Sequence, residues 1–199
     1  MLDTIAENQP DRRPAILVCV YEADDPLWSH LDADGASGWT PPGTRLRPLG
    51  PGDPAALAAL ITGQLDEADC RAVLLIGRTK KSDGFRIQMR AENRALTGGK
   101  KLSQTGPGLA RATAPAAEMV RALTEAGLTA DATSDSEEDV GSYLLYRVLT
   151  ALPDNADAPS VGLLRAPASL DGEQLRLGVQ TAAAAMARHL SPLPRARLS

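Results

Sequence analysis

The sequence is poor in aromatic residues and in cysteine. Aromatic side chains make up 3% of its 199 residues, so Leu, Val, Ile and Ala must supply most of the core. Two cysteines cannot build a disulfide framework, and both Cys19 and Cys70 lie in or beside apolar segments typical of buried thiols. A reducing compartment, the cytoplasm, fits this pattern best.

The chain also lacks long apolar runs and an excess of basic charge. No stretch approaches the roughly 18 apolar residues of a membrane span, and the first residues have no secretory signal pattern. The net charge is −4, which disfavours nucleic acid and anionic membranes as partners. With 43% hydrophobic and 23% charged residues, we expect one globular domain over residues 1–199, with residues 1–12 and 192–199 flexible.

Apolar patterns predict strands that alternate with helices. Continuous apolar runs over residues 14–20 and 71–76 predict strands buried on both faces. Gly84 to Asn93 shows some alternation, which indicates an edge or half-exposed strand. Shorter strands are expected near 45–49, 128–133 and 160–164.

The predicted helices have recognisable ends. Asp53 and Pro54 supply an N-cap and a first helical residue for a helix that runs to about Glu67. Gly127 is suited to end a helix over residues 116–126. Two further helices are expected at 139–151 and 171–189. Alternating strands and helices predict an α/β domain of three layers.

Few side chains suggest chemistry by their spacing alone. His30, with Asp34 nearby, allows a metal or base role, but a solvated helix end is the favoured interpretation. His189 fits a surface position at the end of the last helix. Glu137, Glu138 and Asp139 fit an acidic first helical turn, worth about 0.3–1 kcal/mol per charge, better than a metal site. We expect no cofactor and no metal.

Five short segments occur in an order typical of one enzyme family. They are Ile16–Trp28, Gly77–Asn93, Ser134–Leu145, Leu163–Pro167 and Ser169–Leu170. They resemble the ordered motifs of pyroglutamyl peptidase I (pyrrolidone-carboxylate peptidase), a family of cysteine peptidases that remove N-terminal pyroglutamate. The resemblance implies a single three-layer αβα domain with a mixed central sheet, phosphorylase/hydrolase-like.

The residues that the resemblance aligns with the catalytic triad have all changed. The nucleophilic cysteine falls on Leu145, the histidine base on Arg165 and the orienting glutamate on Gln88. Leucine has no lone pair, arginine stays protonated and glutamine carries no charge. Losing one member of such a triad costs about 10³ to 10⁶ in rate. The resemblance therefore implies a pseudoenzyme.

The family's pyroglutamyl-binding loop is also reduced, to Tyr21–Asp25, and Tyr146 replaces the asparagine that follows the cysteine. Tyr21, Tyr146 and Arg165 remain candidates for a substrate pocket. Arg165 near a helix N-terminus suggests a site for a small anion or peptide. The favoured alternative is that Arg165 pairs with one of the acidic residues at 137–139.

Three functions stay open. The first is an inactive scaffold with a binding or interaction role, and the second is a hydrolase that uses other residues. The third is a regulatory subunit of an active homologue, because the resemblance implies an oligomer. A homo-oligomer or a complex with a homologue is thus an expected partner, whereas nucleic acid and membrane are not.

Overall fold

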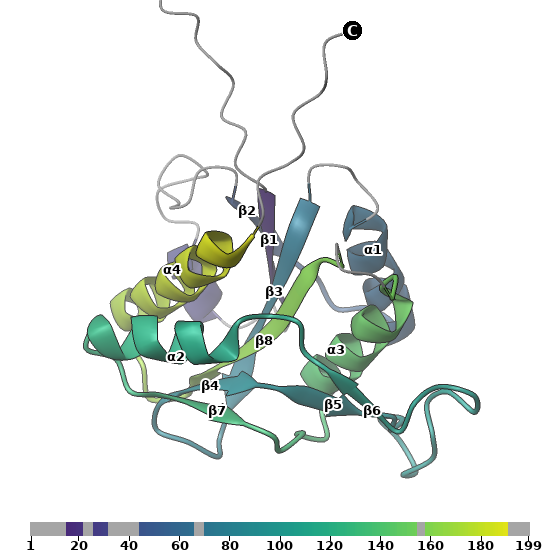
Figure 1. Cartoon of the computed structure of the whole chain (residues 1–199). Helices are drawn as coiled ribbons and strands as arrows, with labels where there is room; N and C mark the ends of the chain where they lie inside the picture. Colours follow the sequence, from purple (N-terminus) through teal and green to yellow (C-terminus); the bar gives the residue numbers. More distant parts are fainter. Residues whose placement is uncertain (1–14, 22–25, 32–43, 66–69, 155–157, 191–199) are drawn as a thin grey trace, which may run out of the picture.

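Six strands form the main sheet, and their order determines which side chains meet (Figure 1). A computed structural model describes residues 15–21, 26–31, 44–65, 70–154 and 158–190. Across the sheet the strands are β2 (Thr44–Pro48), β1 (Ala15–Val20), β3 (Cys70–Thr79), β8 (Ser160–Pro167), β4 (Phe85–Gln88) and β7 (Ala130–Thr133). The first four are parallel, whereas β4 is antiparallel to β8 and parallel to β7. The predicted mixed sheet is confirmed.

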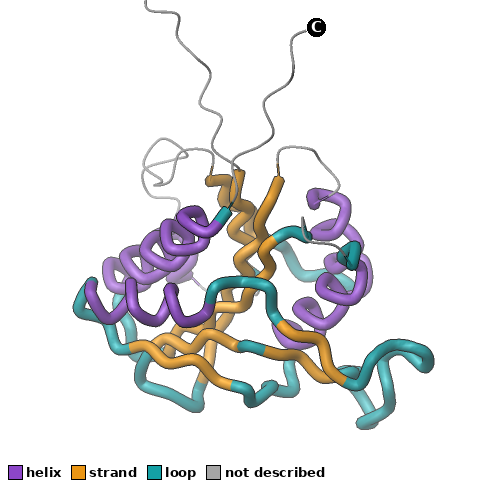
Figure 2. Tube along the Cα trace, viewed as in Figure 1, coloured by secondary structure: helices purple, strands orange, loops and turns teal. Residues whose placement is uncertain are grey.

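Helices cover both faces of this sheet, which confirms the three-layer αβα architecture (Figures 1 and 2). One face carries α1 (Pro54–Leu65) and α3 (Val140–Ala151), and the other carries α2 (Ala116–Glu125), α4 (Gly172–His189) and the 3₁₀ helix η1 (Pro26–Leu31). No helix in the described ranges is long and apolar enough to cross a membrane. The ends predicted to be flexible, 1–12 and 192–199, lie outside the described residues.

Strand β1 explains why the central strands read as unbroken apolar runs. Its side chains alternate between the two faces, so Ile16 and Val18 join the cluster under α2 and α4. Leu17, Cys19 and Tyr21 join the cluster under α1 and α3. Because both faces are covered, neither set of positions can be polar without a partner.

The segment 84–93, predicted as one edge or half-exposed strand, forms two strands, and only the second fits that prediction. The segment divides at Met89 into β4 and β5 (Arg90–Glu92), and β4 lies inside the sheet between β8 and β7. The polar residues that suggested an edge include Gln88, which is fully buried. It is buried because it hydrogen-bonds Arg165 of β8. The edges of the main sheet are β2 and β7.

Residues 90–111, which we call the arm, extend from the body of the domain. Strand β5 pairs with β6 (Leu109–Arg111) in a separate antiparallel sheet, and the loop between them projects outward (Figures 1 and 2). Ala91 and Ala110 pack with the apolar cluster beneath α3. The sequence patterns predict neither β6 nor η1, because each is short and interrupted by polar residues.

The predicted helix signals are present in the structure. The carboxylate of Asp53 accepts a hydrogen bond from the Ala56 backbone N–H at 3.0 Å at the start of α1. Asp171 forms a capping box with Gln174 at the start of α4. Gly127 follows α2 with a φ of 80°, the left-handed conformation that favours glycine.

Two helical glycines should respond oppositely to alanine. At Gly178 of α4 an added Cβ would overlap the ring of Phe85, so Gly178→Ala should destabilise the fold by about 1–3 kcal/mol. At Gly63 of α1 an added Cβ meets nothing, so Gly63→Ala should stabilise it by about 0.5–1 kcal/mol. Urea denaturation measures both changes, and equal shifts of the two midpoints would contradict the packing at Phe85.

Candidate functional site

Arg165 is the centre of a buried polar cluster between β8 and the start of α3. Its side chain is 1% exposed although it carries a charge. Its two terminal nitrogens donate to the two carboxylate oxygens of Asp139 at 2.6 and 2.8 Å, a bidentate pair. The Nε atom donates to the side-chain oxygen of Gln88 at 3.0 Å. Arg165 of β8 therefore binds both Gln88 of β4 and Asp139 at the start of α3, and it links these three elements.

The remaining donors of Arg165 also have acceptors. Nη1 lies 3.2 Å from the carbonyl oxygen of Arg78 and 3.4 Å from the Tyr21 hydroxyl. Nη2 donates to the Ser142 hydroxyl at 3.0 Å. A carboxylate oxygen of Glu137 lies 3.6 Å from Nε. The guanidinium therefore has protein partners on every side, as a buried charge requires.

The electrostatics of the cluster keep Arg165 charged. Burial alone would lower its pKa, since desolvation disfavours a cation. The hydrogen bond to Asp139 and the electrostatic interactions with Tyr21, Asp139 and Glu137 outweigh that effect. The pKa of Arg165 consequently lies above its already high ordinary value. This side chain cannot exchange a proton with a substrate.

Asp139 has two functions in the cluster. It is the N-cap of α3, where one carboxylate oxygen accepts from the Ser142 backbone N–H at 2.9 Å. The same carboxylate binds Arg165. The capping residue that fixes where α3 begins therefore also neutralises the buried cation. The expected pairing of Arg165 with one of the acids at 137–139 is present, and its bidentate partner is Asp139.

Gln88 and Ser142 complete the buried network. The Gln88 amide nitrogen donates to the carbonyl oxygen of Arg90 at 2.8 Å, and its side chain lies within hydrogen-bond distance of the Ser142 hydroxyl. A neutral amide can donate and accept at the same time, which a carboxylate cannot do. Glutamine here binds both a cation and a backbone carbonyl.

Tyr21 covers the start of α3. Its phenol lies so close to Gly77 of β3 and to Gly141 of α3 that a Cβ at either position would overlap it. The ring is 1% exposed and its hydroxyl lies beside Arg165. Both glycines are therefore required by close approach of a side chain. The phenol fills space at the helix N-terminus.

The three triad-equivalent positions converge only in part. Gln88 and Arg165 are in direct contact. Leu145 lies one turn after Ser142 on α3, on the same side of the helix, and is fully buried in the apolar cluster under α1 and α3. Ser142 thus stands between Leu145 and the polar pair.

Other predicted residues lie outside the cluster. The Tyr146 hydroxyl donates to the carbonyl oxygen of Pro107 at 2.8 Å. Tyr146 therefore binds the arm and does not belong to the cluster around Arg165. His30 is exposed at the end of η1, and Asp34 lies outside the described residues. His189 is exposed in the last turn of α4, as predicted.

The acids at the start of α3 are each paired. Glu137 accepts from the Thr79 hydroxyl at 2.8 Å, Glu138 pairs with Arg94, and Asp139 binds Arg165. Among the described residues no group of His, Cys, Asp or Glu has the arrangement of a metal site. A shallow cleft adjoins these acids, between the root of the arm and α3, lined by residues 92, 94–96, 136–139, 142 and 143. It leaves about 20 Å³ for the centre of a water molecule, room for roughly one water.

Neither thiol is placed or activated as a nucleophile. Cys19 and Cys70 are both buried thiols that are not joined in a disulfide. Burial, and then the neighbouring Cys70, raise the pKa of Cys19 to about 12, against a smaller opposing effect of Arg47. A catalytic thiol needs the opposite shift.

Comparison with known proteins identifies the fold. The sequence matches no protein-family model and no curated protein. Pyroglutamyl peptidase I of Bacillus amyloliquefaciens superposes with a TM-score of 0.76 at 15% identity, over 88% of this chain and 98% of that one. The pyrrolidone carboxyl peptidase of Thermus thermophilus gives 0.69 at 19% identity, over 85% and 98%. That of Thermococcus litoralis gives 0.73 at 12% identity, over 93% and 100%. The chain shares the fold of these peptidases.

Replacing Asp139 tests the ion pair. Asp139→Asn keeps an N-cap residue but leaves Arg165 without its bidentate carboxylate, so the free energy of unfolding should fall by about 3 kcal/mol. Asp131→Asn is the matched control, since Asp131 pairs with Arg86 at the surface and should cost less than about 1 kcal/mol. Urea denaturation that gave the same loss for both would contradict a structural role specific to Asp139.

Thiol reactivity tests the environment of Cys19. With its pKa raised to about 12 by burial, Cys19 should form almost no thiolate in the folded protein at mildly alkaline pH. A chromogenic disulfide reagent should therefore react with neither buried cysteine until guanidinium unfolds the chain. Rapid labelling of folded Cys70→Ala protein, in which Cys19 is the remaining thiol, would show that the site is open.

Proposed function

We propose that this chain, which has the fold of pyroglutamyl peptidase I, keeps that scaffold without its hydrolytic chemistry and acts as a binding or interaction protein. The observation that carries the proposal is the bidentate ion pair of Arg165 with Asp139, with Gln88 bound to the same guanidinium. It occupies the place where the resemblance puts the base and its orienting acid. Leu145 takes the position of the nucleophile.

Each step of amide hydrolysis lacks a group at this site. Attack needs a nucleophile with an available lone pair, and Leu145 has none. Transfer of the proton to the leaving amine needs a group that titrates near the working pH. The pKa of Arg165 lies far above that range, because a guanidinium is already protonated at any working pH and Asp139 stabilises its charge further.

Hydrolysis by other residues at the site is disfavoured as well. The Ser142 hydroxyl is a candidate nucleophile in the cluster, and its neighbours include Gln88 and the cationic Arg165. Neither can remove its proton. The Asp139 carboxylate accepts from the Ser142 backbone N–H and is already bound to the guanidinium. A serine in this setting has a structural role, as a link between β4, β8 and α3.

An interaction role is compatible with assembly and with location in the cytoplasm. We propose that partners include further copies of this chain or an active homologue, as the resemblance to oligomeric peptidases suggests. We propose the cytoplasm because both cysteines are free and buried, without a disulfide between them. A small anion or peptide is less favoured at Arg165, since its donors already have acceptors within the protein.

Turnover of a fluorogenic pyroglutamyl amide tests the loss of catalysis. The purified chain should release no fluorophore above the buffer rate, while an active pyroglutamyl peptidase assayed in parallel should release it readily. The Cys19→Ala/Cys70→Ala variant is the matched control for residual thiol chemistry. Appreciable turnover by the wild-type chain refutes the proposal. Loss of this turnover in the double variant would then assign the activity to a thiol. Turnover that persists in the double variant would assign it to another residue.

A further inference from the structure

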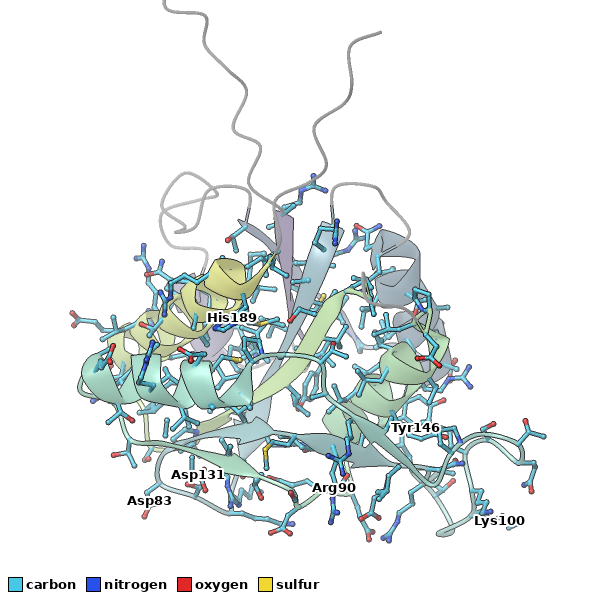
Figure 3. The ribbon with its side chains drawn as sticks, viewed as in Figure 1. Asp83, Arg90, Lys100, Asp131, Tyr146 and His189 are labelled. Carbon is cyan, nitrogen blue, oxygen red and sulfur yellow. The ribbon has the colours of Figure 1, made fainter. Side chains whose placement is uncertain are left out.

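The arm, residues 90–111, carries a charge opposite to that of the rest of the chain. It contains five basic residues and one acidic residue, a net charge of +4. Because the whole chain carries −4, the remaining residues together carry −8. The net charge of the whole chain therefore hides the fact that positive charge is concentrated on the arm. The loop of the arm projects outward from the sheet (Figure 1), and it carries Lys100, whereas Arg90 lies at the root of the arm (Figure 3).

Most of these cations have no carboxylate partner. Arg94 pairs with Glu92 and Glu138. The Arg90 guanidinium donates to the backbone carbonyl of Ser134, which does not neutralise it. For Lys100, Lys101 and Arg111, the part of the chain that the structure describes supplies no ion pair. Figure 3 shows Arg90 at the root of the arm and Lys100 on its outer loop.

The register of the arm places two arginines side by side. Arg90 of β5 is directly opposite Arg111 of β6, and both point to the outer face, because Ala91 and Ala110 point inward. Like charges directly opposite each other destabilise a sheet. A carboxylate bound between two guanidinium groups would remove that repulsion and receive charge-assisted hydrogen bonds.

Exposed apolar side chains accompany the cations. The described residues include five large hydrophobic side chains that are exposed. Two of them are on the arm, Leu96 at 42% and Leu109 at 48%, and Met89 at 37% immediately precedes it. Scattered exposed leucines are ordinary on a protein surface. Their concentration beside unpaired cations indicates a surface for a partner that is both acidic and partly apolar.

The arm is held in position before any partner binds. The Asn93 backbone N–H donates to the Gly108 carbonyl at 3.0 Å, and its side-chain nitrogen donates to the Ser103 carbonyl at 2.8 Å. The Tyr146 hydroxyl fixes Pro107 to α3 at 2.8 Å. A partner would therefore bear little of the entropy loss that ordering a free loop requires.

We propose that the arm binds an acidic segment of another protein. Carboxylates of that segment bind the Arg90–Arg111 pair and the two lysines, and an apolar side chain packs against Leu109. The proposal rests on the interaction role proposed above and specifies its surface and partner chemistry. It does not depend on the loss of catalysis.

Nucleic acid and anionic membranes fit the surface less well. Residues 89–111 contain no aromatic side chain, so bases would have no platform on which to stack. A second segment, residues 131–139, carries five carboxylates and lies beside the arm, through the contacts of Arg94 with Glu138 and of Arg90 with Ser134. An extended anionic surface would approach these acids within a screening length of about 8–10 Å. A short peptide can avoid them.

Fluorescence anisotropy with a labelled peptide of alternating glutamate and leucine tests the proposal. The wild-type chain should bind it, and added salt should weaken binding. Lys100→Glu/Lys101→Glu should weaken it by roughly tenfold or more, because opposed charges become like charges. Arg147→Glu/Arg188→Glu is the matched control, with the same charge change at exposed positions outside the arm, and should bind like wild type.

A second variant separates binding from folding. Leu109→Ser should weaken peptide binding with an unchanged thermal unfolding curve, whereas Leu177→Ser, on the exposed surface of α4, should not weaken it. The proposal is overturned by failure to bind the peptide, by equal losses in the arm variants and their controls, or by tighter binding of an oligonucleotide or of phosphatidylserine vesicles. Activity on a pyroglutamyl amide would refute only the loss of catalysis, so the two proposals fail separately.

Discussion

The ion pair between Arg165 and Asp139 is the constraint on which the rest of the site depends. A guanidinium that is 1% exposed would be costly by several kcal/mol without compensation. The hydrogen bonds that compensate this cost fix the positions of the residues around Arg165. Asp139 must cap α3 at one residue, Gln88 must face β8, and the Tyr21 phenol must lie over the helix start. Three strands and one helix therefore meet with a single arrangement of side chains.

This arrangement also explains why the site has little space. In a peptidase the start of such a helix must leave room for a substrate and for a reacting atom. Here the phenol of Tyr21 lies against Gly77 and Gly141, and Leu145 continues the apolar core. What remains is a cleft with room for roughly one water. Tyr21 and Leu145 therefore both pack the core and fill the volume at the start of α3.

The buried cluster and the arm differ in how their charges are paired. The buried cluster is satisfied within itself, whereas the arm presents exposed leucines and cations such as Lys100, for which the described part of the protein supplies no ion pair. The two are connected through α3, because Tyr146 anchors the arm loop one residue after the buried Leu145. Helix α3 thus holds the closed site on one side and the projecting surface on the other.

The sequence by itself determined the layers of this protein: unbroken apolar runs require strands covered on both faces, and Asp53, Asp171 and Gly127 mark where helices begin or end. Through the resemblance, it also predicts that Leu145, Arg165 and Gln88 lack the groups of a cysteine peptidase triad. Only the tertiary structure decided that Gln88 lies inside the sheet, that Asp139 rather than Glu138 neutralises Arg165, and that Arg90 opposes Arg111. Local patterns record propensity and periodicity. Burial of a polar group and the pairing of charges depend on residues distant in the sequence, which come together only when the sheet forms.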